Sequence, residues 1–170
     1  SYLVHDGEVA FVVDPQRDID RVLDLLGRQG VRLTHVLESH IHNDYVTGGL
    51  ALAERTGAAY LVNGEDHVSF ARTPVHDGQV VEVGDRMRVT AVATPGHTFT
   101  HLSYLLGDAA TGDQVAVFSG GSLLFGATGR PDLLGPEHTD DLVRLQHASS
   151  RRLAEILPDE AEVFPTHGFG

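Results

Sequence analysis

Histidine is unusually frequent in this chain, with eleven among 170 residues, and several histidines lie in short motifs that suit metal binding. The segment 39–45 reads Ser-His-Ile-His-Asn-Asp-Tyr. His40 and His42 are two residues apart in a predicted turn, so both imidazoles can face one point. Asp44 adds a carboxylate two residues later, and Zn(II) and Fe(II) both accept such nitrogen and oxygen ligands. This segment therefore predicts part of a metal site.

Two further histidines belong to turns that contain glycine. His97 lies in a Thr-Pro-Gly-His-Thr motif and His167 in a Pro-Thr-His-Gly motif, each directly after a predicted strand. A single histidine of this kind is expected at an exposed turn, but three such strand ends favour convergence, because strand ends of one sheet layer meet in space. We therefore expect His40, His42 and His97 to converge on one metal ion. Asp44 and His167 are expected to line the same cavity.

The elements that position these motifs follow from hydrophobic periodicity and turn residues. Strands are predicted at 8–13, 33–39, from 60, over a hairpin at 79–94, and at 102–106, 115–118 and 162–164. Helices are predicted at 19–29, 47–56 and 139–156. Strands outnumber helices and many neighbouring strands are linked by hairpins. The pattern therefore favours a layered α/β sandwich, with helices outside two packed sheets, over an alternating βαβ sheet.

The predicted helix boundaries depend on capping residues. Asp18 is expected to cap the first helix, and Gly30 to end it. Gly57 is expected to end the second helix, and Thr139 to cap the third. No repeat, low-complexity run or linker divides the sequence, so one domain is predicted.

Composition excludes several classes of function. The formal net charge of −12 disfavours nucleic acid or an anionic membrane as a partner. The absence of cysteine excludes disulfides, thiolate metal sites and a cysteine nucleophile, and the absence of lysine excludes a Schiff base or a P-loop. No serine lies in a Gly-x-Ser-x-Gly elbow, which disfavours a serine hydrolase. With no membrane-spanning stretch or signal sequence, a cytoplasmic location is expected.

The ordered set of motifs resembles the metallo-β-lactamase superfamily from end to end. The motifs are His-x-His-x-Asp, Thr-Pro-Gly-His-Thr, Gly-Arg-Pro-Asp-Leu at 129–133, and Pro-Thr-His-Gly. Segments 14–18, 40–49, 119–124 and 165–170 are similar to the branch that contains persulfide dioxygenases and their rhodanese-fused relatives. The resemblance implies a four-layer αβ/βα sandwich over residues 1–170, as one domain of a longer protein with a linked rhodanese domain.

The resemblance also implies a ligand set. His40, His42 and His97 match the three-histidine site of the superfamily, and Asp44 and His167 match its second site. In the persulfide dioxygenase branch, one Fe(II) is instead bound through the matches of His40 and His97 and an aspartate. A single divalent ion, Fe(II) or Zn(II), weakly held or lost, is therefore the expected cofactor.

Two departures from the family pattern bear on the chemistry. Tyr45 replaces the histidine that usually follows Asp44, and Gly121 stands where the bridging aspartate is expected. A two-metal site is therefore not expected, and replacing Gly121 with Asp is expected to raise metal occupancy. Arg130 falls in the segment that lies near the thiol substrate in the resembled branch. Asp44, Tyr45 and Arg130 are the residues expected to act on the substrate.

Three functions remain open from the sequence. The leading prediction is a persulfide dioxygenase-like enzyme that oxidises a small thiol persulfide such as glutathione persulfide. The first alternative is a mononuclear zinc hydrolase of thioesters or related bonds, with Asp44 as the base that orients water. The second alternative is a non-catalytic domain that has lost its metal site through Gly121 and Tyr45.

Overall fold

The computed structural model describes residues 1–42 and 45–167 of the chain. The helices within these residues are α1 (Ile19–Gln29), α2 (Gly49–Thr56) and α3 (Pro136–Ile156). The strands before the mid-chain hairpin are β1 (Tyr2–His5), β2 (Val9–Val13), β3 (Arg32–Leu37), β4 (Ala59–Asn63) and β5 (Thr73–Val75). The later strands are β6 (Val80–Val83), β7 (Met87–Ala93), β8 (Leu102–Asp108), β9 (Gln114–Gly120), β10 (Leu123–Leu124), β11 (Ala127–Thr128) and β12 (Glu162–Pro165).

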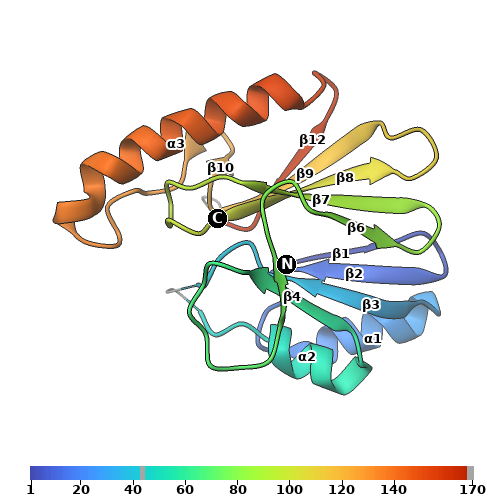
Figure 1. Cartoon of the computed structure of the whole chain (residues 1–170). Coiled ribbons are helices and arrows are strands. Elements are labelled where there is room, and N and C mark those ends of the chain that lie inside the picture. The colour runs from blue at the N-terminus through green and yellow to red at the C-terminus, as the bar shows by residue number, and fades with distance from the viewer. Residues whose placement is uncertain (43–44, 168–170) are drawn as a thin grey trace.

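Two five-stranded sheets carry the fold (Figure 1). The first has the order β1-β2-β3-β4-β5, in which β1 is antiparallel to β2 and the remaining pairs are parallel. The second has the order β12-β9-β8-β7-β6, in which only the β12–β9 pair is parallel. A small hairpin of β10 and β11 lies outside both sheets.

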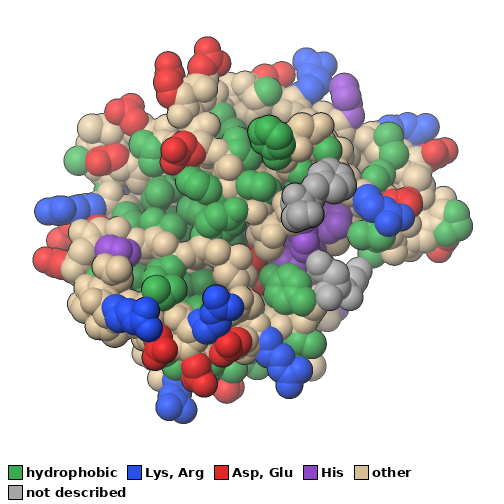
Figure 2. All heavy atoms as spheres, turned by 180° about the vertical axis from the view of Figure 1, so that it is seen from behind, with side chains coloured by type: hydrophobic (Ala, Val, Ile, Leu, Met, Phe, Trp, Pro, Cys, Tyr) green, Lys and Arg blue, Asp and Glu red, His purple; other side chains and the backbone are tan. Residues whose placement is uncertain are grey.

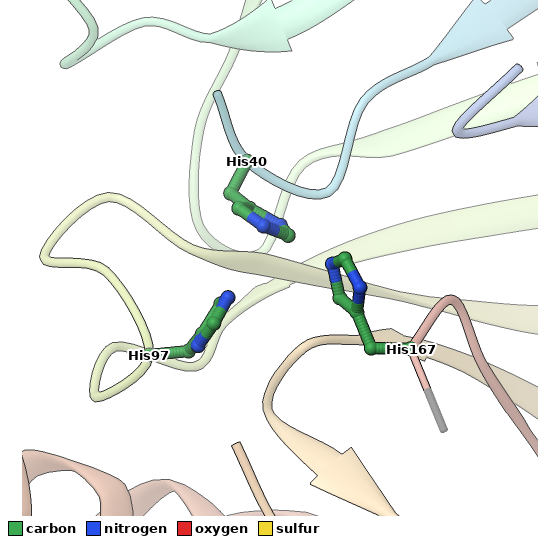
Figure 3. A group of neighbouring side chains, drawn as sticks. All are labelled: His40, His97 and His167. Carbon is green, nitrogen blue, oxygen red and sulfur yellow. The ribbon is translucent and has the colours of Figure 1, made fainter. Parts of the chain in front are cut away.

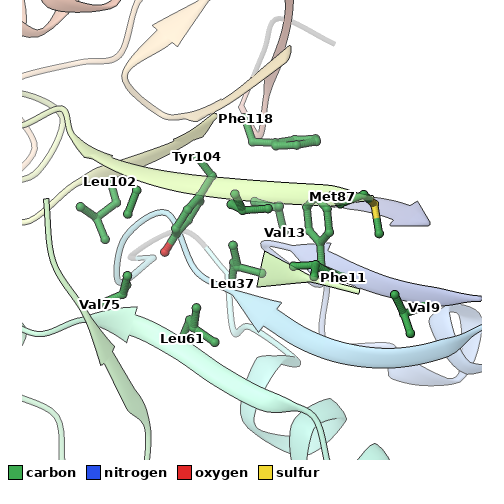
Figure 4. Close-up of a cluster of buried hydrophobic side chains, with 13 residues drawn as sticks. Val9, Phe11, Val13, Leu37, Leu61, Val75, Met87, Leu102, Tyr104 and Phe118 are labelled. Atoms are coloured by element: carbon green, nitrogen blue, oxygen red, sulfur yellow. The ribbon is translucent and has the colours of Figure 1, made fainter. Parts of the chain in front are cut away.

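Helices cover the outer face of each sheet, and the two inner faces enclose the main core (Figures 1 and 4). The side chains of strand β2 alternate between the two faces of the first sheet. Its alternate residues Phe11 and Val13 enter the core between the sheets, whereas Ala10 and Val12 pack toward α1 and α2. Helix α3 covers the second sheet through Leu153. The layers are therefore helix, sheet, sheet, helix, and the predicted four-layer sandwich is confirmed.

Most predicted element boundaries agree with the structure, but two predicted caps do not. Asp18 directly precedes α1, yet its side chain makes no capping hydrogen bond. Gly30 and Gly57 end α1 and α2 in the left-handed conformation, as glycine at these positions predicts. The third helix starts earlier than predicted, because Pro136 supplies a preorganised first turn after Gly135. Thr139 is therefore inside α3, where its hydroxyl donates to the carbonyl of Gly135, and the prediction that it is the N-cap was wrong.

The topology brings the ends of several strands to one edge of the molecule. Strands β2, β3, β7, β9 and β12 all end at this edge, and each continues into a segment with polar or histidine side chains. Figure 2 shows histidine side chains gathered in one hollow of the surface. Within the described residues, no helix is both long and apolar enough to cross a bilayer.

Candidate metal centre

Three imidazoles meet at the carboxyl ends of strands far apart in the sequence. His40 follows β3, His97 follows β7 and His167 follows β12, and their rings face one another (Figure 3). One nitrogen of each ring lies within 4.8 Å of the other two. The ring centroids are 4.8 Å apart for His40 and His97, 5.5 Å for His40 and His167, and 5.6 Å for His97 and His167. We call these residues the three-histidine cluster.

A hydrogen-bond chain fixes the orientation of His40. The hydroxyl of Ser39 donates its proton to Oδ2 of Asp14 at 2.7 Å, so it accepts from Nδ1–H of His40 at 2.8 Å. The lone pair of His40 is therefore on Nε2, on the side available to a metal. Burial is the largest of the causes that lower the pKa of His40 well below its usual value, and it keeps this ring neutral.

Backbone and hydroxyl groups support the other two imidazoles. Nδ1–H of His97 donates to the carbonyl of Arg130 at 3.1 Å, because a carbonyl can only accept, and the lone pair is again on Nε2. The hydroxyl of Thr166, next to His167, donates to Oδ2 of Asp14. Asp14 therefore supports two of the three imidazole-bearing segments.

Beside this cluster, a second group combines two buried carboxylates with one histidine. Nε2 of His42 lies 3.3 Å from Oδ1 of Asp14 and 3.5 Å from Oε2 of Glu38. The hydroxyl of Tyr45 is 2.8 Å from the same nitrogen. The other Glu38 oxygen accepts from Tyr60 at 3.0 Å. We call Asp14, Glu38 and His42 the carboxylate cluster; their side chains are at most 1% exposed.

Charge is distributed unevenly within the carboxylate cluster. Burial lowers the pKa of His42, but hydrogen bonds and charge from Asp14 and Glu38 outweigh burial and raise it to about 9. Burial raises the pKa of Asp14, but His42, Thr166 and the backbone N–H of Ser39 bring it well below its usual value. Burial raises the pKa of Glu38 despite its contact with His42. The arrangement corresponds to an Asp14–His42 ion pair with Glu38 beside it.

His101 is a buried neutral histidine. Its Nε2 accepts from the N–H of Gly121 at 3.0 Å, so Nδ1 carries the proton and donates to the hydroxyl of Thr94 at 2.8 Å. Burial lowers the pKa of His101 to about 3. Its ring stacks on that of His40, with centroids 5.0 Å apart. Both nitrogens are thus engaged, and His101 acts as support for the strand end rather than as a ligand.

The structure brings together part of the predicted site in a different combination. His40 and His97 lie together as expected, but His167 completes their group, while His42 is in the carboxylate cluster. Tyr45 contacts His42. Asp44, predicted as a ligand and base, lies outside the described residues.

Arg130 contributes to the site in a way that the sequence did not predict. Its carbonyl holds His97, while its guanidinium is exposed and donates two hydrogen bonds to Asp132. The backbone of Arg130 therefore supports the three-histidine cluster, and its side chain is exposed at the surface.

Sequence reasoning missed the supporting residues Asp14, Glu38, Ser39 and Thr166. Asp14 has φ of 48°, in the left-handed region that aspartate tolerates better than most residues. The available signal was an acidic residue directly after an apolar strand and before a proline. Such a residue is expected at a turn, and nothing local predicts that it lies under two other segments.

Comparisons with known proteins agree with this architecture. A sequence profile described as the Metallo-beta-lactamase superfamily matches residues 1–167. The chain is 39% identical over 150 residues to the hydroxyacylglutathione hydrolase-like protein of Homo sapiens, which is 86% of this chain and 48% of that protein. It is 36% identical over 121 residues to the hydroxyacylglutathione hydrolase of Acidiphilium cryptum, which is 70% of this chain and 49% of that protein. The chain thus spans about half the length of these curated relatives.

Solved structures show the same fold. The crystal structure of ETHE1 from Myxococcus xanthus matches 99% of this chain and 70% of that chain, with a TM-score of 0.83 and 34% identity. A metallo-beta-lactamase from Staphylococcus aureus subsp. aureus COL matches 96% of this chain and 50% of that chain, with a TM-score of 0.87 and 30% identity.

Proposed function

The chain belongs to the metallo-beta-lactamase superfamily, and from its three-histidine cluster we propose that it is a mononuclear metalloenzyme that oxidises a small thiol persulfide. The observation that carries the single-ion part of the proposal is the convergence of His40, His97 and His167. The reaction itself rests on the resemblance to the persulfide dioxygenase branch, whose aspartate ligand is replaced by Gly121 in this chain. Gly121 offers no side chain to bridge a second ion, and His42 lies against Asp14 and Glu38 instead. The similarity to ETHE1 and the motifs of the persulfide dioxygenase branch support this reaction.

The donor set fits a divalent metal ion. Imidazole nitrogen suits Fe(II) and Zn(II), and two metal–nitrogen bonds of about 2.1 Å span at most about 4.2 Å. The three nitrogens, all within 4.8 Å of one another, are therefore close to the separation that one ion requires. When bound, Fe(II) supplies the one-electron chemistry that oxidation of sulfur by O₂ needs.

The residues of the chain prepare this site before any substrate arrives. The Ser39–Asp14 chain and the Arg130 carbonyl hold the Nδ1 protons of His40 and His97, so that each Nε2 lone pair is presented to the ion. Neutral imidazoles leave the positive charge of the ion available to an anionic sulfur. The carbonyl that supports His97 and an exposed guanidinium belong to the same residue, Arg130, and this guanidinium is the group that would bind a carboxylate of a glutathione-type substrate.

Hydrolysis of a glutathione thioester is the second candidate. It is favoured by the identity of 36% and 39% to proteins named hydroxyacylglutathione hydrolase or hydroxyacylglutathione hydrolase-like. Both candidates share a thiol-derived substrate, and they differ in whether O₂ or water is the second reactant. Asp44, the proposed base in the hydrolytic reaction, lies outside the described residues.

One set of assays separates the candidates. Protein prepared anaerobically is loaded with Fe(II) or with Zn(II), and metal content, O₂ consumption with glutathione persulfide and hydrolysis of a glutathione thioester are measured. We expect one iron per chain and O₂ consumption that disappears in His40→Ala. Thioester hydrolysis by the zinc form without O₂ consumption by the iron form would contradict the proposal and favour the second candidate. Protein that retains neither metal would indicate a non-catalytic domain.

A further inference from the structure

Helix α3 buries polar side chains in the middle of the face that covers the second sheet (Figure 1). Its four buried residues share one face of the helix and are Leu142, Gln146, Ser149 and Leu153. Leu153 packs against the sheet, as expected of a covering helix. Gln146 and Ser149 are 4% and 3% exposed, and a buried polar group is costly unless a hydrogen bond satisfies it. The partners of these two residues therefore indicate what this part of the helix does.

Both polar residues bond to segments that carry or support His97. The hydroxyl of Ser149 donates to the carbonyl of Pro95 at 2.7 Å, two residues before His97. The side-chain nitrogen of Gln146 donates to the carbonyl of Ser122 at 2.9 Å and lies 3.1 Å from the hydroxyl of the same serine. Helix α3 is thus bonded both to the loop after β7 and to the turn after β9.

Glycine at position 96 lets the loop after β7 lie directly on the helix. Gly96 has φ of +146°, a conformation that favours glycine. A Cβ built there would also lie 2.5 Å from both Cα and Cβ of Gln146, whereas unstrained carbon contacts are about 3.5–4.0 Å. The backbone next to His97 therefore contacts Gln146 directly, with no room for a side chain between them.

Ser122 connects Gln146 to the group that holds the ring of His97. The carbonyl of Ser122, which accepts from Gln146, also accepts from the N–H of Gly129 at 3.1 Å. Gly129 directly precedes Arg130, whose carbonyl accepts from Nδ1–H of His97 at 3.1 Å. Gln146 is therefore linked to His97 along two routes, one through the backbone of the loop and one through the segment that holds the ring.

We propose that Gln146 and Ser149 are positioning residues of the metal site: from the buried face of α3 they fix the loop after β7 and so the place of the His97 imidazole. The metal part of this inference rests on the proposed function, whereas the contacts to the loop do not. Asp14 supports the segments of the other two imidazoles. Helix α3 supplies the equivalent support for the third.

Neighbouring serines provide a matched pair of variants. Ser149→Ala removes the bond to the loop, whereas Ser150→Ala removes a bond to the carbonyl of Gln146 inside the helix at 3.0 Å. Zn(II) affinity is measured by competition with a chromophoric chelator. We expect Ser149→Ala to weaken Zn(II) binding about fivefold, as for the loss of one hydrogen bond, and Ser150→Ala to match the wild type.

A second comparison separates positioning from loss of stability. Gln146→Met keeps most of the length of the side chain but cannot donate to Ser122, so we expect Zn(II) binding about tenfold weaker, as when the support of a ligand is lost. Leu153→Ala leaves a cavity against the sheet and should lower the melting temperature without changing Zn(II) affinity. The visible absorption spectrum of Co(II)-loaded protein depends on ligand geometry, so Gln146→Met should change this spectrum and Leu153→Ala should not.

Amide hydrogen exchange tests the contacts without any metal ion. With chelator present, Gln146→Met should accelerate exchange at Gly129, whose N–H shares the carbonyl of Ser122 with Gln146. Exchange should also accelerate at Gly96, whose N–H donates to the carbonyl of Thr98 within the loop. Amides of β3, in the first sheet, serve as the reference and should exchange as in the wild type.

Two results would overturn the inference. One is unchanged Zn(II) affinity and an unchanged Co(II) spectrum in Gln146→Met, and the other is an equal loss of Zn(II) affinity in Leu153→Ala. If Gln146→Met did not fold, the serine pair would decide, and equal affinities of Ser149→Ala and Ser150→Ala would contradict the inference. If the wild type itself bound neither Zn(II) nor Fe(II), the proposed function would fail, and exchange at Gly129 would still decide whether Gln146 fixes this region.

Discussion

The three-histidine cluster and the carboxylate cluster are neighbours with opposite electrostatic character. The rings of His40 and His42 are only 4.1 Å apart between centroids, and both follow the same strand. His40 is kept neutral among other imidazoles, whereas His42 lies between Asp14 and Glu38, which favour its protonated form. Two histidines from one short motif thus belong to different chemical environments.

This difference shows what a spacing motif can and cannot specify. The motif His-x-His places two imidazoles near one strand end, but most of the groups that surround each ring come from other segments, and only Glu38 belongs to the same strand end. For His40 these are His97 and His167, and for His42 they are Asp14 and Glu38. Asp14 belongs to both environments, since it supports His40 through Ser39 and contacts His42 directly.

The largest expected effect is a difference in Zn(II) affinity between variants of His167 and of His42. We expect His167→Ala to weaken Zn(II) binding by more than about 100-fold, because losing a ligand exceeds the 10–100-fold cost typical of losing a ligand's support. His42→Ala should leave Zn(II) affinity nearly unchanged, yet cost about 3–5 kcal/mol of folding free energy, since it leaves buried carboxylates without their cation. Chelator competition and urea unfolding measure the two quantities. A loss of Zn(II) affinity in His42→Ala comparable to that in His167→Ala would place His42 among the ligands.

A smaller difference in folding free energy and Zn(II) affinity is expected between variants of the carboxylates Asp14 and Glu38. Asp14 accepts hydrogen bonds from Ser39 and Thr166 as well as contacting His42, so we expect Asp14→Asn to cost about 2–3 kcal/mol of folding free energy. It should also weaken Zn(II) binding about tenfold, through the loss of the support to His40. Glu38→Gln keeps its size and its bond from Tyr60, and should cost only about 1 kcal/mol without changing Zn(II) affinity. The reverse order of the two variants in urea unfolding would show that Glu38 is the principal partner of His42.

The pH dependence of stability in metal-free protein should have opposite signs for the two environments. The pKa of His101, beside the three-histidine cluster, is lowered to about 3, so the unfolded chain binds more protons there. Stability should therefore fall as pH decreases below about 6.5. The pKa of His42 is raised to about 9, so its contribution is complete below about 6.5 and is lost as pH rises through 9.

Single variants test which histidine causes the loss of stability on the acid side and which causes it on the alkaline side of this pH profile. His101→Gln retains a donor and an acceptor and should reduce the loss of stability on the acid side only. His42→Ala should reduce the loss on the alkaline side only. Chemical unfolding between pH 4 and pH 10, in the presence of chelator, measures both slopes; unchanged slopes in these variants would contradict the assigned charge states.

The smallest structural effect is expected at the surface next to the site. Arg130 and Asp132 are largely exposed, so their ion pair should contribute little, and Arg130→Ala should leave the melting temperature unchanged. The carbonyl that holds His97 remains in this variant, so Zn(II) affinity should also be unchanged. If the guanidinium binds a substrate carboxylate, KM should rise while kcat is retained. Activity measured against substrate concentration decides this, and an unchanged KM would remove Arg130 from substrate binding.

The sequence alone determined much of the frame. Periodicity gave helices and strands close to those observed, and glycine after α1 and α2 marked their ends, because these signals depend on residues near in sequence. Histidines at separate strand ends predicted convergence, and His40 and His97 do lie together. The order of the motifs predicted the four-layer fold through its resemblance to the metallo-β-lactamase superfamily.

Only the tertiary structure decided the partners within that frame. In the structure, His167 lies beside His40 and His97. His42 instead lies against Asp14 and Glu38, and the ring of His97 lies against Gly121. Some of these contacts join segments that are separated in the chain by at least one strand or helix. The others depend on the direction in which a side chain points from its turn. Local periodicity carries no information on such directions, since they are set by the packing of the two sheets and the space that each neighbour leaves.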